Sequence, residues 1–595
     1  MLKTSYIITL LSGIGFFNSC TGNFIHLQKY QEQFAYYQPT ESAYGNYLAG
    51  RVALMRQDYN AASKYYVKTM EKGLVNEDIL SKTYSILASQ GNIDEAVKYA
   101  VEARKNGDIN NFIDVIEAVY AFKNKNYKEA RQKFEAIQEK TYQSLITPLF
   151  NAWSYVGEDN YNKAVAELKK ISTAEEMSTV YNLHRGLIAE YFNRFDEAEV
   201  FYNIMIKDNA NDISFRALQI ISNFLIRIGQ KDKASTLIAK YYGVSNMKEM
   251  LSSLSDRIRK SDMNIQPIVK NAEVGVSEVF LEIALLFKSV PAGYDYAQMY
   301  MAISQYFNPD NDIAKVAMAD IFDERQMYKE ANKYYDSIDK TSDVYYPAQI
   351  KKANNLSNEK KYDESIRVLK RLLKDNPENF QVLFNLGDVL RISDNQPDAI
   401  KYYNEAIKSI FYESEKHWPV YYAIAVSYDR NKEWSKAEEN LKKALELSNR
   451  HPQVLNYLGY SWLKNETNTD KAISYILEAY EKEPNDGVII DSLGWVYFKT
   501  GDYKNAILYL EKASELNPQN AIISDHLGDA YWLGGRKNEA IYLWKHALTQ
   551  KEEKEELNIK NVKYKINNGL KNTNSLKIED ESIKESLHSL NDITE

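Results

Sequence analysis

The residues with the clearest capacity for chemistry lie around His526. In the stretch Ser524–Asp529, carboxylates flank this imidazole, a combination that can transfer protons or bind a metal. None of the seven histidines forms a pair at metal-ligand spacing, and neither H-E-x-x-H, G-x-S-x-G nor a Gly-Lys dipeptide occurs. We therefore interpret His526 as a helix-packing residue and predict no catalytic residue, no metal site and no cofactor.

The single cysteine, Cys20, follows a segment with the order of an export signal: one lysine, an apolar run of about a dozen residues and a small polar pair. We predict that residues 1–19 are a signal peptide; a short hydrophobic helix that stays attached is the alternative. A lone thiol forms no internal disulfide. Its position resembles the lipobox of bacterial lipoproteins, in which the cysteine is lipidated, although Phe17 and Asn18 replace the usual leucine and small residue. With Thr21 after the cysteine, the resemblance implies an anchor in the outer membrane.

Composition favours a folded, helix-rich chain. The 595 residues include only 23 glycines and 12 prolines, about half of the usual share, so strands and tight turns are not expected to dominate. An apolar share of 44% is sufficient for a large core. The formal net charge of -8, from 74 basic and 82 acidic side chains, provides no basic excess for a phosphate backbone, so no nucleic-acid partner is expected.

An internal repeat of 34 residues runs through nearly the whole sequence. Its marker is a small residue, nearly always alanine, that is followed by apolar residues four and seven positions later. The regular steps predict about fourteen structural units. The markers are Ala62, Ala96, Ala130, Ala164, Ala198, Ala234, Ala297, Ala331, Ser365, Ala399, Ala437, Ala472, Ala506 and Ala540.

The unit at residues 487–520 shows the reason for this period. It contains two segments with helical apolar spacing, joined at Gly501 and ended by Pro518. Small residues at Gly494 and Ala506 allow the two helices to cross closely. The unit and the one that follows it resemble the tetratricopeptide repeat (TPR) family, which implies an all-α fold, a right-handed superhelical α-solenoid of about fourteen helix hairpins. The resemblance rests on Leu493, Gly494, Tyr497, Ala506, Ala513 and Pro518, and then on Leu527, Gly528, Tyr531, Ala540, Trp544 and Ala547.

The repeat also predicts the organisation of the chain. The step from Ala234 to Ala297 is five residues short of two periods, and the sequence there keeps no clean pattern. We therefore expect an irregular joint between two arrays. The expected order is a signal peptide at 1–19, a linker after the lipidated cysteine at 20–45, an N-terminal TPR-like array at 46–240, the joint at 241–275, a C-terminal TPR array at 276–550, a capping helix at 551–570 and a disordered tail at 571–595.

The first helices of TPR hairpins line a concave groove. Residues three before and one after the small position of a first helix are expected to face this groove, as are some positions further along. A polar residue inside an otherwise apolar helix is costly unless it meets water or a ligand; a solvated helix face is the alternative for each. Aromatic anchors beside charges are typical of binding hot spots, which favours Trp495 and Trp532. The predicted groove residues are Arg391, Arg430, Asn456, Tyr460, Lys464, Asp491, Trp495, Lys499, Asp525, Asp529 and Trp532.

The acidic groove residues predict the charge of the ligand. Relatives that clamp a terminal carboxylate use lysine and asparagine, whereas Asp491, Asp525 and Asp529 would repel a carboxylate. We therefore expect a neutral or basic protein segment. Some glycosyltransferases carry such repeats before a catalytic domain, but only 45 residues follow Gln550, so an enzyme is not expected.

The export signal, the lipid site and the repeats together resemble bacterial envelope TPR lipoproteins. Residues 454–462, 491–495 and 525–530 are similar to the most recognisable stretch of that group. Some members are adaptors that bind carboxy-terminal processing proteases and deliver cell-wall hydrolases to them. The resemblance implies a non-enzymatic, lipid-anchored scaffold on the periplasmic face of the outer membrane, with a protease or hydrolase as partner. The alternative is an assembly factor of the envelope that binds glycan or export machinery through Trp495 and Trp532.

Overall fold

The computed structural model describes residues 42–592 apart from 138, 140–144, 172–174, 209–212, 243–246, 261–264, 290–292, 551–556 and 571–575. The predicted signal peptide at 1–19, Cys20 and most of the linker at 20–45 lie outside these residues. Within the described residues the secondary structure is helical, and it contains no strand. The chain divides into two compact units, residues 1–361 (unit 1) and 362–595 (unit 2).

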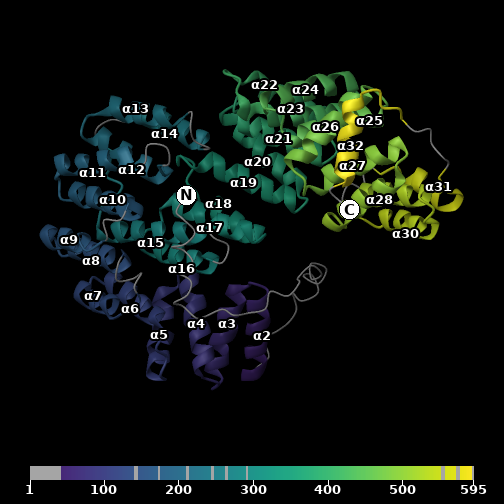
Figure 1. Cartoon of the computed structure of the whole chain (residues 1–595). Helices are drawn as coiled ribbons and strands as arrows, with labels where there is room; N and C mark the ends of the chain where they lie inside the picture. The colour runs from purple at the N-terminus through teal and green to yellow at the C-terminus, as the bar shows by residue number, and fades with distance from the viewer. Residues whose placement is uncertain are drawn as a thin grey trace. The chain divides into compact units, whose positions relative to one another are not determined.

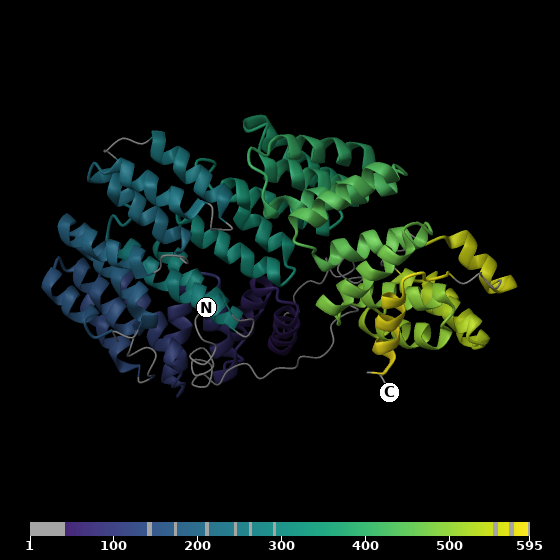
Figure 2. The ribbon, with the colours of Figure 1, turned by 45° about the horizontal axis from the view of Figure 1, so that its top comes forward.

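Unit 1 consists of antiparallel helix hairpins packed side by side (Figures 1 and 2). Its helices are α2 (Ala43–Met55), α3 (Tyr59–Glu71), α4 (Glu77–Ser89), α5 (Ile93–Lys105), α6 (Asn111–Lys123), α7 (Tyr127–Ala136), α8 (Thr147–Gly157), α9 (Tyr161–Leu168), α10 (Glu175–Tyr191), α11 (Phe195–Asp208), α12 (Phe215–Arg227), α13 (Lys231–Tyr242), α14 (Lys248–Lys260), α15 (Ala272–Lys288), α16 (Tyr294–Phe307), α17 (Asp312–Glu324), α18 (Tyr328–Asp336) and α19 (Tyr345–Asn358).

Unit 2 continues the same design and ends with two helices outside the hairpins. Its elements are α20 (Tyr362–Asp375), α21 (Phe380–Ile392), α22 (Gln396–Lys408), the 3-10 helix η4 (Glu415–His417), α23 (Trp418–Arg430), α24 (Trp434–Leu447), α25 (Pro452–Lys464), α26 (Thr469–Lys482), α27 (Gly487–Thr500), α28 (Tyr503–Leu516), α29 (Ala521–Leu533), α30 (Lys537–Ala547), α31 (Ile559–Asn568) and α32 (Glu581–Asp592).

The repeat markers lie where the helices pack. All fourteen, from Ala62 to Ala540, have no exposed surface, because each lies on the face of a second helix that is covered by its neighbours. A larger side chain at any of these positions would hold the packed helices apart. The predicted all-α solenoid of helix hairpins is therefore confirmed.

The turn between the two helices of a hairpin repeats as regularly as the marker. In thirteen hairpins a residue with left-handed backbone conformation follows the first helix, five or six positions before the marker, and it allows the chain to reverse. Most of these residues are not glycine, which is consistent with the low glycine content. They are Gln57, Gly91, Lys125, Asp159, Asn193, Gly229, Gln326, Lys360, Asp394, Lys432, Glu466, Gly501 and Gly535.

The hairpin α15–α16 gives unit 1 contacts between helices that are distant in sequence. Helix α15 packs against α8, and α16 packs against α4 (Figure 1). Phe280 of α15 lies fully buried within reach of Phe134, Phe150 and Phe307. The first helices of the N-terminal hairpins are thus covered by a later hairpin of the same chain.

This packing places the division of the chain elsewhere than expected. We expected an irregular joint at 241–275 between arrays at 46–240 and 276–550. The structure instead has helix α14 and the start of α15 in that range, and its two units meet at residues 361 and 362. Because α15 and α16 pack onto α4 and α8, residues 272–307 belong to the N-terminal unit.

The C-terminal residues also differ from expectation. The tail at 571–595 was expected to be disordered, but its described part contains helix α32, in which Ile583 and Leu587 are buried. These two side chains pack against the core of unit 2, and this burial explains the order of the helix. Helix α31 lies within the range 551–570 that was predicted to hold a capping helix.

A candidate protein-binding face in unit 2

Most of the predicted groove residues of unit 2 belong to one side of its first helices, α21, α23, α25, α27 and α29; we call this side the first-helix face. Arg391 and Trp532 are exceptions, because they contact Tyr403 and Trp544 of the second helices. Small residues on the opposite side, which are glycine in four of these helices and Ala425 in α23, fix how each helix is rotated. A Cβ at Gly387 would lie 2.5 Å from the ring of Tyr403, and one at Gly528 would lie 2.6 Å from that of Trp544. Because the second helix must approach at the glycine, the residues three before and one after it are held on the first-helix face.

The structure buries more of the predicted residues than an open groove requires. Asn456, Asp491 and Asp529 are buried, and Arg430 and Lys464 are exposed. The remaining ones are partly buried: Arg391, Tyr460, Trp495, Lys499, Asp525 and Trp532. The carboxamide Oδ1 of Asn456 has no hydrogen-bond partner among the described residues, and a buried acceptor of this kind is costly until a donor reaches it.

Three of these helices, α25, α27 and α29, meet at His526, which is buried on α29. Its Nδ1 lies 2.9 Å from Oδ2 of Asp491 on α27, and its Nε2 lies 3.4 Å from the hydroxyl of Tyr460 on α25. The ring stacks on Trp495 at 4.0 Å between centroids. Burial lowers the pKa of His526, but Asp491 above all, and then Asp525 and Asp529, raise it above the ordinary histidine value. The imidazole therefore fixes α29 to α25 and α27, which agrees with the packing role that we predicted.

A second cluster holds a buried lysine that sequence reasoning missed. Nζ of Lys565, on α31, lies 2.6 Å from a carboxylate oxygen of both Asp525 and Asp529. Trp544 Nε1 donates to Oδ1 of Asp529 at 2.8 Å, and the ammonium lies 5.5 Å from the Trp544 ring centroid. Burial raises the pKa of Asp529 to about 6, against the lowering effect of Lys565. We call Asp525, Asp529 and Trp544 the lysine site.

The two clusters together are short of positive charge. They contain three carboxylates, those of Asp491, Asp525 and Asp529, against one lysine and one histidine. Even with His526 protonated, one negative charge is left over, and desolvation makes that charge costly. The face therefore favours a cation and disfavours a carboxylate.

The other predicted residues bond elsewhere, although the ring of Trp532 lies 5.3 Å between centroids from that of Trp544 in the lysine site. Arg391 donates to Tyr403 and Asp388 within its own hairpin, and Lys499 forms an ion pair with Glu466 at 2.8 Å. The indole Nε1 of Trp532 donates to the carbonyl of Leu570 at 3.0 Å. The exposed Arg430 and Lys464 lie at the ends of α23 and α25.

Two partly buried aromatic residues of this face were also missed. Phe384 on α21 and Tyr422 on α23 lie three positions before the small residues of their helices, Gly387 and Ala425. This is the position that Asn456 has on α25. The rule that selected Asn456 would have found both, had it been applied to the earlier hairpins as well as to the last three.

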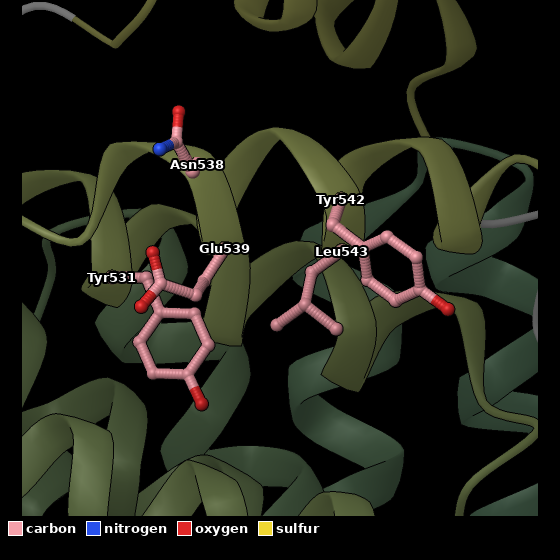
Figure 3. Close-up of a pocket in the computed structure, with 5 residues that line it drawn as sticks. All are labelled: Tyr531, Asn538, Glu539, Tyr542 and Leu543. Carbon is pink, nitrogen blue, oxygen red and sulfur yellow. The ribbon is translucent and has the colours of Figure 1, made fainter.

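The opposite side of the last hairpin has a shallow depression of about 400 Å³. Figure 3 shows its lining residues on α29 and α30: Tyr531, Asn538, Glu539, Tyr542 and Leu543. None of the predicted groove residues lines it. Tyr542 there is 69% exposed, which makes it a useful reference position away from the first-helix face.

The described residues contain no group of three or more histidine, cysteine, aspartate or glutamate side chains placed to hold a metal ion. Among the described helices, none has both the length and the apolar character needed to cross a bilayer.

Comparison with known proteins agrees with this architecture. Residues 350–411 and 419–451 match models described as tetratricopeptide repeat, and residues 494–535 match a TPR repeat model. The matched segments therefore carry tetratricopeptide repeats, and the helix hairpins around them follow the same design.

Among curated proteins, the chain is similar to BBSome complex member BBS4 of Bos taurus, with 30% identity over 143 residues, 24% of this chain and 26% of that protein. It is also similar to a TPR repeat-containing protein of Pseudomonas aeruginosa, with 23% identity over 163 residues, 27% of each. The matches thus span about a quarter of each relative. Among solved structures, a chain of the APC/C hetero-tetramer Cut9-Hcn1 is similar at 14% identity and a TM-score of 0.37, covering 88% of this chain and 96% of that chain.

Proposed function

We propose that this protein is a non-enzymatic scaffold that binds partner proteins on the first-helix face of unit 2. The observation that carries the proposal is the lysine site, where this face already holds a basic segment of polypeptide through two carboxylates. Beside it, Tyr460 and Trp495 offer partly buried aromatic surface, and aromatic anchors next to charges are favoured at protein interfaces.

The chemistry of the face selects the kind of partner. The excess of carboxylates favours a segment with lysine or arginine and disfavours a terminal carboxylate. The unpaired Oδ1 of Asn456 accepts a hydrogen bond from such a segment. BBS4, one of the relatives, is by its name a member of a protein complex, which is in keeping with a role in assembly.

The partner and place that we propose follow from the sequence. Lipidation of Cys20 anchors the scaffold at the outer membrane, facing the periplasm, where a carboxy-terminal processing protease or a cell-wall hydrolase is the partner. To check the anchor, cells are fed a clickable fatty acid. We expect label on the wild-type chain and none on the Cys20→Ala variant; equal labelling of the two would contradict the anchor.

The alternative is an envelope assembly factor that binds glycan or export machinery through Trp495 and Trp532. One observation counts against the use of Trp532 in this alternative, because its indole N–H is already bonded to the carbonyl of Leu570. Quenching of tryptophan fluorescence by soluble wall fragments would favour it.

The face itself is tested with a double variant, Tyr460→Ser with Trp495→Ser. Both side chains offer partly exposed rings, so their loss is expected to weaken partner capture from envelope extracts by at least tenfold, about 1.4 kcal/mol. Tyr542→Ser, which removes an exposed ring from the other side of the unit, is the matched control and is expected to leave capture unchanged. Thermal unfolding of each variant shows whether unit 2 remains folded, since both rings also contact His526. Undiminished capture by a folded double variant would refute the assignment.

A further inference from the structure

The C-terminal residues 557–570 and 576–592, which we call the strap, run back along unit 2 from its last hairpin. After α31, the Leu570 carbonyl accepts from Trp532 on α29, and the N–H of Leu576 donates to the carbonyl of Lys499 on α27 at 2.8 Å. The Leu587 carbonyl of α32 then accepts from the hydroxyl of Tyr497 on α27 at 2.9 Å. The strap thus contacts hairpins that precede it by up to about a hundred residues.

Lys565 is the residue through which the strap reaches the lysine site. It is 1% exposed, and its ammonium has an aspartate on two sides and the Trp544 ring on a third. Two carboxylates and one aromatic face are a combination that recognises an alkylammonium group. The site is therefore built for a lysine, and the strap supplies one.

Apart from Lys565, the strap is held by apolar side chains. Four of them are buried in the core of unit 2, namely Leu557, Val562, Ile583 and Leu587. Five more are partly buried against that core: Ile566, Leu570, Leu576, Ile578 and Leu590. The intervening charged residues are exposed, among them Lys563 and Lys584. Because only four of about thirty residues are buried apolar side chains, the strap gains little beyond the conformational entropy that it loses on ordering.

Exchange of one lysine for another costs the site little. Removing Lys565 alone would leave Asp525 and Asp529 buried and uncompensated, which is strongly unfavourable. An incoming lysine restores both ion pairs and the contact with Trp544 as the resident one leaves. The equilibrium between strap and partner is then decided by the side chains around the lysine.

We infer that the strap is the resident, exchangeable occupant of the lysine site, and that a partner helix carrying a lysine takes the same site when the strap leaves. The inference rests on the proposed function. It adds the sequence pattern that the face recognises: an apolar residue, a lysine three positions later and an apolar residue directly after the lysine, as in Val562, Lys565 and Ile566. The strap then competes with partners. The apparent affinity for a partner is the intrinsic affinity multiplied by the fraction of molecules in which the strap has left the site.

The turn after α31 provides a second means of weakening the strap. Gly569 has φ of +75°, and a Cβ placed there would lie 2.0 Å from the ring of Trp532. A β-branched residue at this position is therefore both strained and in steric conflict. Gly569→Val is expected to release α31 through this conflict with Trp532, and it leaves every residue of the lysine site unchanged.

The test uses a fluorescent synthetic peptide of residues 557–592 and the full-length chain. We expect the peptide to bind the Lys565→Gln chain at least tenfold more tightly than the wild-type chain, because the resident strap is weakened and the lysine site is vacated. Gly569→Val is expected to act in the same direction. The matched control, Lys563→Gln, makes the same change at an exposed position of the same helix and should bind as the wild type does. A peptide that itself carries Lys565→Gln should bind the Lys565→Gln chain at least tenfold more weakly than the unmodified peptide.

Hydrogen exchange in α31 and α32 completes the test. Protection there should fall in Lys565→Gln and Gly569→Val and remain in Lys563→Gln. Unchanged protection, or loss of protection without tighter peptide binding, would overturn the inference, and so would equal binding of the two peptides. Because no partner protein is present in this assay, its failure is separate from a failure of the capture experiment: a strap that does not exchange leaves the binding face intact, and a face that captures nothing leaves the strap exchange measurable.

Discussion

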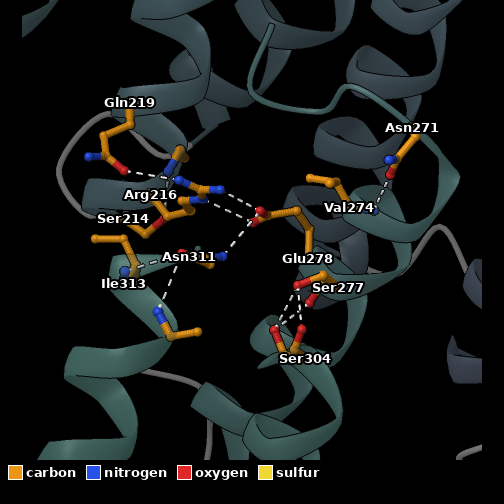
Figure 4. A network of polar contacts seen from close by, with 12 residues as sticks. Ser214, Arg216, Gln219, Asn271, Val274, Ser277, Glu278, Ser304, Asn311 and Ile313 are labelled. Carbon is orange, nitrogen blue, oxygen red and sulfur yellow. Dashed lines mark hydrogen bonds and ion pairs between the residues drawn. The ribbon is translucent and has the colours of Figure 1, made fainter. Parts of the chain in front are cut away.

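Replacing Arg216 by alanine is expected to destabilise unit 1 by about 3–5 kcal/mol. Arg216, on α12, forms a two-armed ion pair with Glu278 of α15, with Nε 3.0 Å from Oε2. Glu278 is only 1% exposed, so the variant leaves a carboxylate buried without its counter-charge. Figure 4 shows Arg216 and Asn311 converging on Glu278 from different elements.

The same network extends to the end of unit 1. Gln219, also on α12, donates to Asp343 at 2.9 Å, and Arg257 of α14 donates to the same carboxylate at 2.7 Å. Polar side chains therefore tie α12, α14 and α15 to the segment before α19. This arrangement explains why residues 272–361 belong to the N-terminal unit.

The measurement for Arg216→Ala is hydrogen exchange of α12 and α15 in increasing denaturant, since an array of hairpins need not unfold in one step. Arg259→Ala, which removes an exposed ion pair with Asp256, is the control and should change stability by less than about 1 kcal/mol. Replacing Arg216 by methionine and Glu278 by leucine together should restore much of the loss, since both buried charges are then absent. A loss below about 1 kcal/mol for Arg216→Ala would show that the pair does not hold the unit together.

Replacing Trp153 by alanine is expected to cost unit 1 about 3–5 kcal/mol as well, through a cavity rather than a charge. Trp153 is fully buried on α8, and its Nε1 donates to Nδ1 of His184 on α10 at 3.0 Å. Its ring lies against Gly275 of α15, where a Cβ would approach it to 2.1 Å. The variant therefore creates a cavity between α8 and α15 and leaves the acceptor nitrogen of His184 without its hydrogen bond.

Exchange protection of α8, α10 and α15 reports this loss. Tyr44→Ala removes a ring that is 71% exposed and should change stability by no more than about 0.5 kcal/mol. Unaltered protection of α15 in Trp153→Ala would mean that the hairpin α15–α16 does not depend on the N-terminal helices.

The spacing of small residues predicted the hairpins because those residues have one physical role. Every marker from Ala62 to Ala540 is buried where helices cross. Because close packing requires a small residue at each crossing, small residues recur in the sequence at regular spacing. The turn residues with left-handed backbone conformation form a second regular series of positions, but their residue types do not reveal it. Residues such as Gln57, Lys125 and Lys360 adopt that conformation without being glycine, so their type gives no signal.

The folding back of α15–α16 was missed because each hairpin was assigned to its sequence neighbours. One signal was available. Helix α15 is apolar on nearly all sides, with Val274, Val279, Leu281 and Ile283 all buried, and such a helix must be covered all round. The partner of that helix that is distant in sequence, α8, follows from the tertiary fold and not from a local pattern.

The proposed binding face shows the same limit. The position rule placed Tyr460, Asp491, Trp495, Asp525 and Asp529 on one side of their helices, and the structure groups them there. It gave no indication of their partner Lys565, which lies 36 residues after Asp529 in a helix that we read as a solvated cap. The two partners of a long-range ion pair are not related by the repeat spacing, so the sequence pattern does not identify them.

Site-specific photo-crosslinking shows whether a partner protein contacts the first-helix face of unit 2. A photoreactive phenylalanine analogue replaces Tyr460 on the first-helix face or, as the reference, Tyr542 on α30, and the chain is illuminated with envelope extract. We expect a discrete partner adduct from position 460, reduced by excess peptide of residues 557–592 and not by the peptide carrying Lys565→Gln. We expect no such adduct from position 542. An adduct from position 542, or one from position 460 that both peptides leave unchanged, would contradict the proposed binding face.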